Sequence, residues 1–436
     1  MKSTTNNKNI KAALTVATAA LLGTSHSSQA QTAEEDSWQI DSAFLYYSET
    51  DRVSAGEAII NAQKTFEDEE VLNLKLTIDT LTGSSANGAV AQPTVQTFTR
   101  PSGNGQYQIN ENDTPLDDTF KDTRVQLNAQ WTQPIAADYT LSTGGHLSKE
   151  YDYLSLGINA NLAVDFDRKN STFSAGFSFF HDTFSPEGGI PKPLSSMLIG
   201  DNNDSNWDEN FSQTRLSSDD TKTTTDFLLG FTQVINRRMI MQFNYSYSMV
   251  DGYLTDPFKI VSVVNSNGIT QDNIYESRPS SRAKQSLYAQ SMYHFETNVL
   301  DVSYRYMWDD WDIASHTIDS RLRIPLGDLW GKESYVQPHA RFYQQSAAEF
   351  YRAFIQKSDV TGIEHISADY RIGEMTAYTL GLKFGTLING ENELSFRLEY
   401  YRQTPTGGGR EPIGVLNDLE LYPTVDAVIG QVTYSF

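Results

Sequence analysis

Charged side chains recur at every second position in several segments of the last third of the sequence. Asp319, Arg321 and Arg323 form one such series, and Arg397 and Glu399 form another. Residues two apart lie on the same face of a β-strand, so this spacing predicts a charged strand face. That face could line a selective pore, or its charges could stiffen the wall by pairing with one another. The predicted charged array comprises Asp301, Arg305, Asp319, Arg321, Arg323, His339, Arg341, Lys383, Glu393, Arg397 and Glu399.

An oxygen-rich run lies between residues 201 and 209. Its carboxylates, Asp201, Asp204, Asp208 and Glu209, are of the type that calcium prefers. The spacing does not match an EF-hand loop, because no glycine stands at the required turn. Calcium binding in an external loop is therefore one hypothesis, and a solvated acidic loop is the other. No other metal or cofactor is expected.

Two histidines precede a serine by two residues, in His146-Leu147-Ser148 and His365-Ile366-Ser367. On one strand face, a histidine beside a serine nucleophile could hydrolyse lipid esters. No orienting Asn or Asp is evident at matching depth. The chain also lacks cysteine, a glycine loop for nucleotides and a zinc pair at helical spacing. We therefore expect no enzyme, with lipid hydrolysis as the remaining catalytic alternative.

The elements that would position these residues are strands. Apolar residues alternate with polar ones in Leu72, Leu74, Leu76 and Ile78, and the longest such run covers residues 239–249. In a helix this pattern would spread apolar groups around the whole cylinder. Segments of about ten alternating residues are typical of strands that span a membrane.

Short and long connections alternate along the chain, which is a second property of membrane barrels. Short links lie near 167–169, 236–238, 297–298 and 389–391, and we place them in the periplasm. Long polar links at 81–120, 183–222, 253–281, 347–372 and 404–423 would face the exterior. Counting back from the C-terminus predicts about sixteen antiparallel strands, or fourteen without those near 53 and 138. The predicted starts are 38, 53, 71, 121, 138, 151, 169, 223, 239, 283, 299, 313, 334, 373, 392 and 425.

The first thirty residues have the composition of a cleavable signal peptide. Lys2, Lys8 and Lys11 precede a short apolar stretch, and Ser28-Gln29-Ala30 supplies the small residues of a cleavage site. We predict export of residues 31–436, as a single outer-membrane barrel domain. Tyrosine (23) and phenylalanine (22) are abundant, as in the aromatic girdles of such barrels. The net charge of -22 argues against nucleic-acid binding.

The last strand ends in an aromatic residue. Val432, Tyr434 and Phe436 share one face, together with Val428 and Gly430. This ending is typical of the signal that the barrel-assembly machinery reads. The predicted partners are therefore that machinery and the lipid bilayer of the outer membrane.

Several segments resemble DUF3570, a bacterial family of unknown function. They include Tyr46-Tyr47-Ser48-Glu49, Leu76–Gly83, Pro115–Arg124 and Ser148–Tyr153. The family tends to have Gly-Ala-Ser-Pro-Asn-Gly-Ala where this chain has Gly83-Ser84-Ser85-Ala86-Asn87-Gly88-Ala89. The resemblance implies an outer-membrane barrel and no established activity.

The segment 81–120 is too long and too rich in turn residues for a simple hairpin. It could fold into the lumen as a plug, or it could form a compact external loop. The residues assigned to this family motif or plug are Gly83, Asn87, Gly88, Asp117, Asp118, Asp122 and Arg124.

Three functions remain open. A pore or transporter for small solutes is the first hypothesis. A structural or partner-binding barrel, with a blocked lumen and active external loops, is the second. An outer-membrane lipid hydrolase is the third.

Overall fold

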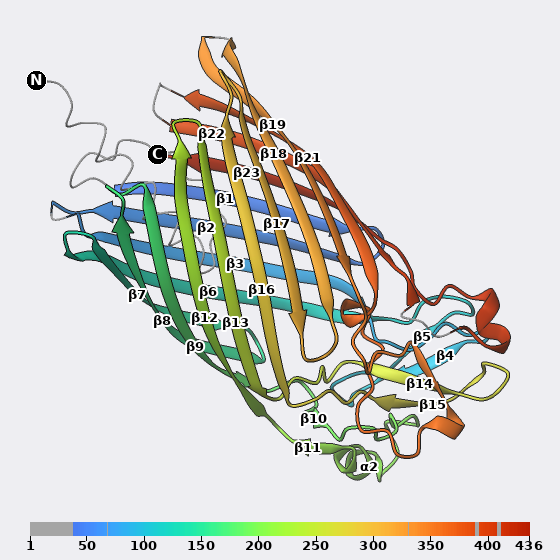
Figure 1. The fold of residues 1–436 in the computed structure, drawn as a ribbon. Helices are drawn as coiled ribbons and strands as arrows, with labels where there is room; N and C mark the ends of the chain where they lie inside the picture. Colours follow the sequence, from blue (N-terminus) through green and yellow to red (C-terminus); the bar gives the residue numbers. More distant parts are fainter. Residues whose placement is uncertain (1–37, 68, 330, 389–391, 408–410) are drawn as a thin grey trace, which may run out of the picture.

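The computed structural model describes residues 38–67, 69–329, 331–388, 392–407 and 411–436 (Figure 1). The predicted signal peptide, residues 1–30, and the link Asn389-Gly390-Glu391 lie outside these ranges.

Sixteen antiparallel strands close into a barrel (Figure 1). Each pairs with its neighbours in sequence order, and β1 pairs with β23 to complete the ring. The prediction of sixteen strands is confirmed and the alternative of fourteen is wrong, because the segments near 53 and 138 form β2 and β7. The strands are β1 (Trp38–Glu49), β2 (Val53–Thr65), β3 (Val71–Ala86), β6 (Leu116–Ala136), β7 (Tyr139–Lys149), β8 (Tyr153–Phe166), β9 (Ser171–Phe184), β12 (Asp220–Asn236), β13 (Met239–Gly252), β16 (Ser281–His294), β17 (Val299–Asp309), β18 (Ala314–Leu329), β19 (Lys332–Gln345), β21 (Met375–Ile388), β22 (Asn392–Pro405) and β23 (Val425–Ser435).

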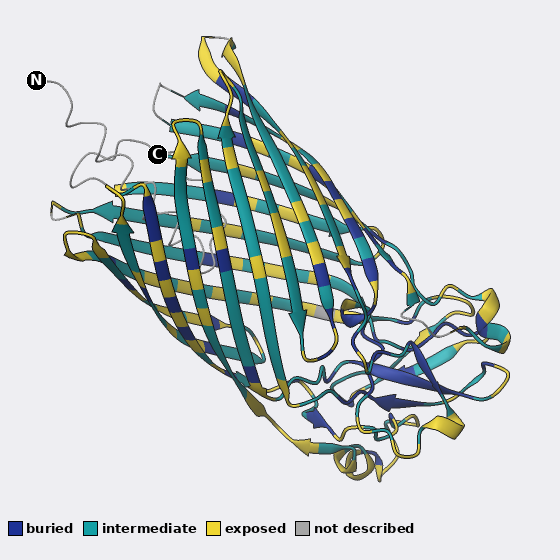
Figure 2. Cartoon of the chain, in the orientation of Figure 1, coloured by how far each residue is buried: buried dark blue, intermediate teal, exposed yellow. Residues whose placement is uncertain are grey.

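The outer surface of the barrel is apolar. Leu380 pairs with Tyr400 and Leu382 with Leu398, and all four side chains are exposed on the outside. Exposed and covered residues alternate along the strands (Figure 2). Only lipid can cover so continuous an apolar wall, and a closed barrel leaves no backbone group unpaired in hydrocarbon. The protein is therefore an outer-membrane β-barrel.

Every long connection lies at the end of the barrel opposite the start of β1 and the end of β23 (Figure 1). In outer-membrane barrels the long loops face the exterior and the short turns face the periplasm. The only α-helix within the described long loops is α2 (Trp207–Gln213). No helix in the described ranges is long and apolar enough to cross a membrane.

The five long loops pack together into what we call the loop cap, formed by residues 87–115, 185–219, 253–280, 346–374, 406–407 and 411–424. Strand β14 (Ile260–Val264) pairs in antiparallel fashion with β15 (Thr270–Tyr275) and in parallel with β20 (Phe354–Gln356) from a different loop. The other short elements are β4 (Gln96–Thr99), β5 (Gln106–Ile109), β10 (Ile190–Pro191), β11 (Arg215–Ser217), η2 (Lys357–Asp359), η3 (Tyr370–Ile372) and η5 (Gly414–Asp418).

The hydrophobic core lies mainly in the loop cap rather than inside the barrel (Figure 2). Phe98, Phe354, Ile366 and Leu416 come from three different loops and are at most 1% exposed. Burying such side chains stabilises a fold by roughly 1.5–3 kcal/mol each. The loops therefore form one packed unit.

The segment 81–120 is divided between the wall and the cap. Residues 81–86 belong to β3 and residues 116–120 to β6, so only 87–115 form a loop. Asp117, Asp118, Asp122 and Arg124 consequently lie on a barrel strand and not in a plug. The loop forms the β4–β5 hairpin and packs on β14, beyond the ends of the barrel strands (Figure 1).

Candidate functional site

The predicted charged array lies on five neighbouring strands, β17, β18, β19, β21 and β22. The register places Asp301 beside Arg321, and Lys383 beside Arg397. Their neighbours in sequence, such as Val302 and Leu398, are exposed on the outer surface. Because strand residues alternate between faces, the whole array lines the lumen.

His339 joins two carboxylates of this wall. Its Nε2 lies 2.9 Å from Asp319 Oδ2, and its Nδ1 lies 2.8 Å from Glu399 Oε1. An imidazole can donate to both partners only as the protonated imidazolium. Arg321 and Arg397 extend the cluster, at 3.4 Å from Asp319 and 3.7 Å from Glu399.

A second cluster surrounds Glu393. The Tyr335 hydroxyl donates to this carboxylate at 2.5 Å, and Lys383 Nζ lies 3.4 Å from it. Arg323 stacks on the Tyr335 ring, 3.5 Å from its centroid, and its Nη2 is 3.9 Å from Glu393. Much of the array is thus paired within the wall.

Arg305 and Arg341 differ from the other cations of the array. Both are exposed to the lumen, and no carboxylate of the described ranges forms a salt bridge with either. Arg305 lies over the ring of Tyr288, at 5.4 Å. The array also has six arginines and lysines against four carboxylates, so this wall is electropositive.

The facing wall carries small polar side chains at mid-height, and its charged residues, such as Asp122, Arg124, Asp165 and Asp182, lie nearer its ends. Strands β6 to β9 lie half a turn away in the barrel order. Their inner faces hold small polar side chains such as Ser142, Ser155, Asn161 and Ser178, all at most 7% exposed. The lumen therefore has one densely charged side and one side whose middle consists of hydroxyl and amide groups.

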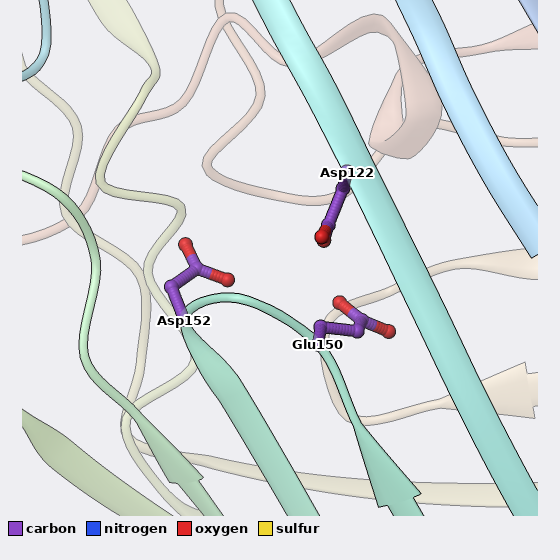
Figure 3. A group of neighbouring side chains, drawn as sticks. All are labelled: Asp122, Glu150 and Asp152. Carbon is purple, nitrogen blue, oxygen red and sulfur yellow. The ribbon is translucent and has the colours of Figure 1, made fainter.

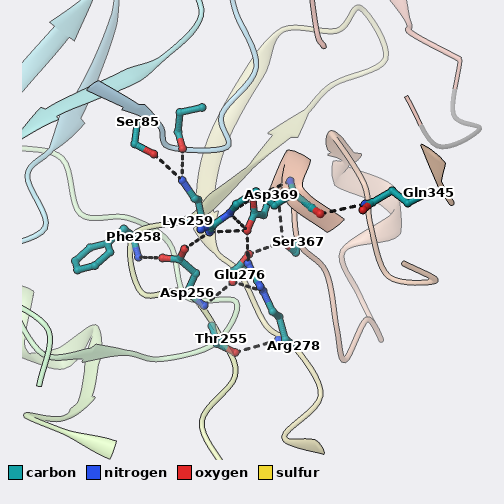
Figure 4. A network of polar contacts seen from close by, with 12 residues as sticks. Ser85, Thr255, Asp256, Phe258, Lys259, Glu276, Arg278, Gln345, Ser367 and Asp369 are labelled. Atoms are coloured by element: carbon teal, nitrogen blue, oxygen red, sulfur yellow. Dashed lines mark hydrogen bonds and ion pairs between the residues drawn. The ribbon is translucent and has the colours of Figure 1, made fainter. Parts of the chain in front are cut away.

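Buried ion pairs connect the loops of the cap (Figure 4). Arg278 lies 2.6 Å from Glu276 and 2.9 Å from Asp369, which belongs to another loop. Arg371 pairs with Asp256 at 2.5 Å. Lys259 contacts the backbone oxygen of Ala86 at the end of β3 and lies 3.3 Å from Ser85 Oγ. The cap ion cluster thus consists of Asp256, Lys259, Glu276, Arg278, Asp369 and Arg371.

The cap ion cluster crosses the outer mouth of the barrel. Five strands separate β3 from β13, and three separate β13 from β19 in the barrel order. Lys259 follows β13 yet reaches β3, and Arg278 reaches the loop that follows β19. Contacts between such distant strand ends hold the cap over the lumen.

Burial and the neighbouring arginines together set the pKa values of the carboxylates in this cluster. Burial raises the pKa of Asp369, but the guanidinium groups of Arg371 and Arg278 outweigh it and hold this pKa well below its usual range. Burial raises the pKa of Glu276 to about 7 despite its contact with Arg278. Asp369 is therefore the permanent anion between the two arginines.

Three carboxylates converge at the outer end of the β6–β8 wall, namely Asp122, Glu150 and Asp152 (Figure 3). Their oxygens lie within 4.8 Å of one another. Burial, a hydrogen bond with Asp122 and that carboxylate's charge raise the pKa of Glu150 to about 7. A proton shared with Asp122 accounts for this close approach near neutral pH.

This shared proton predicts a pH dependence. The pKa of Glu150 is higher in the folded protein than in the unfolded chain. Its contribution to the free energy of unfolding is therefore complete below about pH 4.5 and is lost as pH rises through 7. Hydrogen exchange at residues 149–153, corrected for intrinsic rates, should show less protection at pH 8 than at pH 6. Glu150→Gln should remove the difference, whereas Glu187→Gln, at an exposed loop position, should keep it. Equal protection of the wild type at both pH values would contradict the shared proton.

The predicted calcium residues do not converge. Asp201 accepts a hydrogen bond from the Asn203 backbone, and Asp204 accepts one from Asn206. Asp208 and Glu209 lie in the first turn of α2. Within the described ranges, Asp122, Glu150 and Asp152 form the only group of three acidic residues whose carboxylate oxygens lie within 4.8 Å of one another.

Neither histidine–serine pair forms a nucleophile and base in the described ranges. His146 Nδ1 lies 2.7 Å from Asn128 Oδ1, an orienting partner that the sequence did not reveal. However, His146 and Ser148 face the lumen, away from lipid. Ser367 donates to Glu276, and His365 lies 3.4 Å from Ser277.

The two glycines of the predicted motif have positive φ angles, +135° at Gly83 and +98° at Gly88. A Cβ at Gly88 would lie 2.4 Å from the Ile260 oxygen, and one at Gly83 would lie 2.2 Å from the Arg52 oxygen. Only glycine fits such close backbone contacts. Asn87 is buried beside Gly88 and donates to the Tyr107 hydroxyl at 2.9 Å. The motif therefore joins the barrel wall to the cap.

Val432, Tyr434 and Phe436 lie at the seam where β23 pairs with β1. Phe436 is 49% exposed, and its ring stacks on Tyr434 with centroids 5.4 Å apart. Its backbone exchanges two hydrogen bonds with Ile40. These residues therefore both close the barrel and present an aromatic edge.

Several solved structures of outer-membrane proteins align with this chain at low sequence identity. A bacterial polysaccharide outer-membrane secretin aligns with 93% of this chain and 100% of its own, at 9% identity and a TM-score of 0.45. OprB of Pseudomonas putida aligns over 92% and 94%, at 9% identity and a TM-score of 0.41. OmpT of Vibrio cholerae aligns over 92% and 100%, at 9% identity and a TM-score of 0.40. A search of curated proteins found no match.

The family profile described as "Protein of unknown function (DUF3570)" matches residues 11–436. This match covers nearly the whole chain and confirms the resemblance carried by the motifs of the first half. The chain therefore belongs to the DUF3570 family of outer-membrane β-barrels.

Proposed function

We propose that this protein is a passive channel for small solutes, with its outer mouth covered by the loop cap. The observation that carries the proposal is the charged wall of β17–β22, which faces a wall of mainly hydroxyl and amide groups across the middle of the lumen. A barrel that served only as a scaffold would need no such separation of charge. Side chains lining a water-filled lumen tune which solutes pass.

The arginines of the wall that form no salt bridge within the described ranges determine whether the channel prefers anions or cations. Arg305 and Arg341 are free to attract anions, and the paired residues hold the remaining charges in place. We therefore propose a preference for anions over cations.

Planar-bilayer recordings test this preference. The variant Arg305→Ala/Arg341→Ala should shift the reversal potential toward cation selectivity. With water between charge and ion, two lost charges should change the permeability ratio by about two- to fivefold. Arg402→Ala removes an arginine from the outer surface and should leave selectivity unchanged. An open channel whose selectivity is the same in the double variant would refute a role for these arginines.

The second candidate is a barrel with a blocked lumen whose cap binds a partner. The packing of the cap favours it, because the four hydrophobic clusters make the loops a folded unit. Single-channel conductance separates the two candidates. Discrete openings support the channel, and electrical silence of both the wild type and cap-disrupted variants supports the blocked barrel.

We propose no catalytic activity and no cofactor for either candidate. Calcium binding by the external loops and lipid hydrolysis remain predictions. A change of melting temperature with calcium tests calcium binding. A phospholipase assay in detergent with calcium tests lipid hydrolysis.

A further inference from the structure

Four tyrosines gather where the lumen meets the loop cap. Tyr47 comes from β1, Tyr343 from β19 and Tyr401 from β22, and all three share the inward parity of the charged array. Tyr370 comes from η3 of the cap. Tyr401 and Glu49 both lie opposite Ala427, and Glu49 accepts from the Tyr47 hydroxyl. The Tyr370 ring lies beside Arg52, three residues beyond the end of β1. We call this group, with Arg341 and Gln403, the tyrosine site.

The register sets these large side chains beside small ones. Tyr343 and Gln403 flank Ala377 in one row across the sheet. In the next row, Tyr401 stands between Thr379 and Ala427. Ala377 and Ala427 are only 4% and 2% exposed, so the neighbouring large side chains cover them. Alternating large and small residues give the inner wall a ridged surface of aromatic rings.

Hydrogen bonds hold each strand tyrosine in one orientation. The hydroxyl of Tyr343 donates to Gln345 at 2.5 Å, that of Tyr401 to Gln403 at 2.8 Å, and that of Tyr47 to Glu49 at 2.8 Å. The same arrangement, from residue i to i+2, therefore recurs on three strands. Rings fixed in this way lose little conformational entropy when a ligand stacks on them.

One polar group of the site is unsatisfied. Gln403 is 8% exposed, and its amide nitrogen has no hydrogen-bond partner in the described ranges. A buried donor without a partner destabilises the fold. A ligand with acceptor oxygens would satisfy this donor while it lies against the rings.

The tyrosine site lies on the route of a solute that passes the cap. Gln345 donates to the backbone oxygens of Arg371 and Gly373, which ties this part of the wall to the cap. The guanidinium of Arg52 lies 5.7 Å from the Tyr370 ring centroid, on the other side of the site.

We propose that the tyrosine site binds a neutral saccharide. Sugar rings present flat C–H faces that pack on aromatic rings, and hydroxyls that accept from the Gln403 amide and the Arg341 guanidinium. A simple anion would use Arg341 but not the rings, and an apolar ligand would leave Gln403 unsatisfied. This inference rests on the proposed channel and goes beyond its preference among ions: the preference concerns small ions that pass Arg305 and Arg341, whereas the saccharide is a neutral solute held by aromatic rings.

Isothermal titration calorimetry of the purified full-length protein in detergent, with maltotriose and cellotriose as probes, tests the proposal. We expect millimolar binding of at least one of these neutral trisaccharides. Tyr401→Ala should weaken it at least about tenfold, since the aromatic contact and the apolar area that the ring buries are together worth about 1.4 kcal/mol or more. Tyr401→Phe keeps the ring and should bind within about threefold of the wild type, since the lost hydroxyl bonds to Gln403 rather than to the sugar.

Two further variants keep the test decisive. Tyr378→Ala removes an outward-facing tyrosine from the neighbouring strand and should bind like the wild type. Gln403→Met preserves side-chain length and should weaken binding even if Tyr401→Ala does not fold. Absence of binding of both trisaccharides, or equal binding by Tyr401→Ala, would overturn the inference.

Conductance measured on the same preparations shows whether the saccharide site or the channel has failed the test. An open channel that does not bind either sugar refutes the saccharide site alone. Sugar binding by an electrically silent barrel refutes the channel and leaves the binding site in place.

Discussion

Replacing Arg278 by alanine is expected to release the loop cap from the mouth of the barrel. Arg278 neutralises Glu276, which is 0% exposed, and Asp369, which is 1% exposed. Removing one partner of a buried ion pair leaves a buried charge uncompensated and costs about 3–5 kcal/mol. Asp369 retains Arg371, so most of the loss arises at Glu276.

The consequence should be local, because the barrel strands do not depend on this pair. Limited proteolysis should cut the loops at 253–280 and 346–374 faster than in the wild type, while the barrel stays intact. Mean conductance or open probability in planar bilayers should rise. Lys357→Ala changes an exposed residue of the same cap and should alter neither measurement.

A second substitution tests the electrostatic cause. Glu276→Gln in the Arg278→Ala background removes the uncompensated charge, so it should restore part of the protease resistance. Unchanged proteolysis and conductance in Arg278→Ala would show that the ion cluster does not hold the cap.

Deleting residues 432–436 is expected to abolish the folded barrel. These residues pair with Ile40–Phe44 across the seam between β1 and β23. Each backbone group left unpaired in hydrocarbon costs several kcal/mol, so the deletion should cost on the order of 10 kcal/mol. The band that migrates as folded protein in unheated gels should be lost.

The single variant Phe436→Ala separates closure of the barrel from recognition by the assembly machinery. It keeps the backbone hydrogen bonds with Ile40 and removes only the ring stacked on Tyr434. If the machinery reads this aromatic residue, the amount of assembled protein in cells should fall while refolding in detergent stays near wild type. Trp38→Ala, which removes an exposed aromatic from β1 near the same seam, should assemble normally. Normal assembly of Phe436→Ala in cells would contradict the proposed role of the residue.

The barrel could be predicted from the sequence because its pattern is local. Alternation of the kind seen in Leu394, Phe396, Leu398 and Tyr400 assigns each side chain to lipid or lumen without knowledge of its neighbours. Once the up-and-down order is assumed, parity places residues such as Arg321 and Glu399 inside, where the structure has them. The strand predicted to begin at 121 begins at Leu116, because its polar outer end extends beyond the apolar pattern.

The loop cap could not be predicted in this way. Glu276, Arg278 and Asp369 lie in irregular segments, and their contacts join residues about ninety positions apart. No periodicity links β14 with β20 or Gln403 with Tyr343. The sequence alone determined the compartment, the strand order and the face of each strand residue, because these follow from the two-residue period of a strand in a bilayer. Only the tertiary structure decided which charges pair, which polar groups remain unsatisfied and what covers the mouth, because these depend on distances between segments that no local pattern relates.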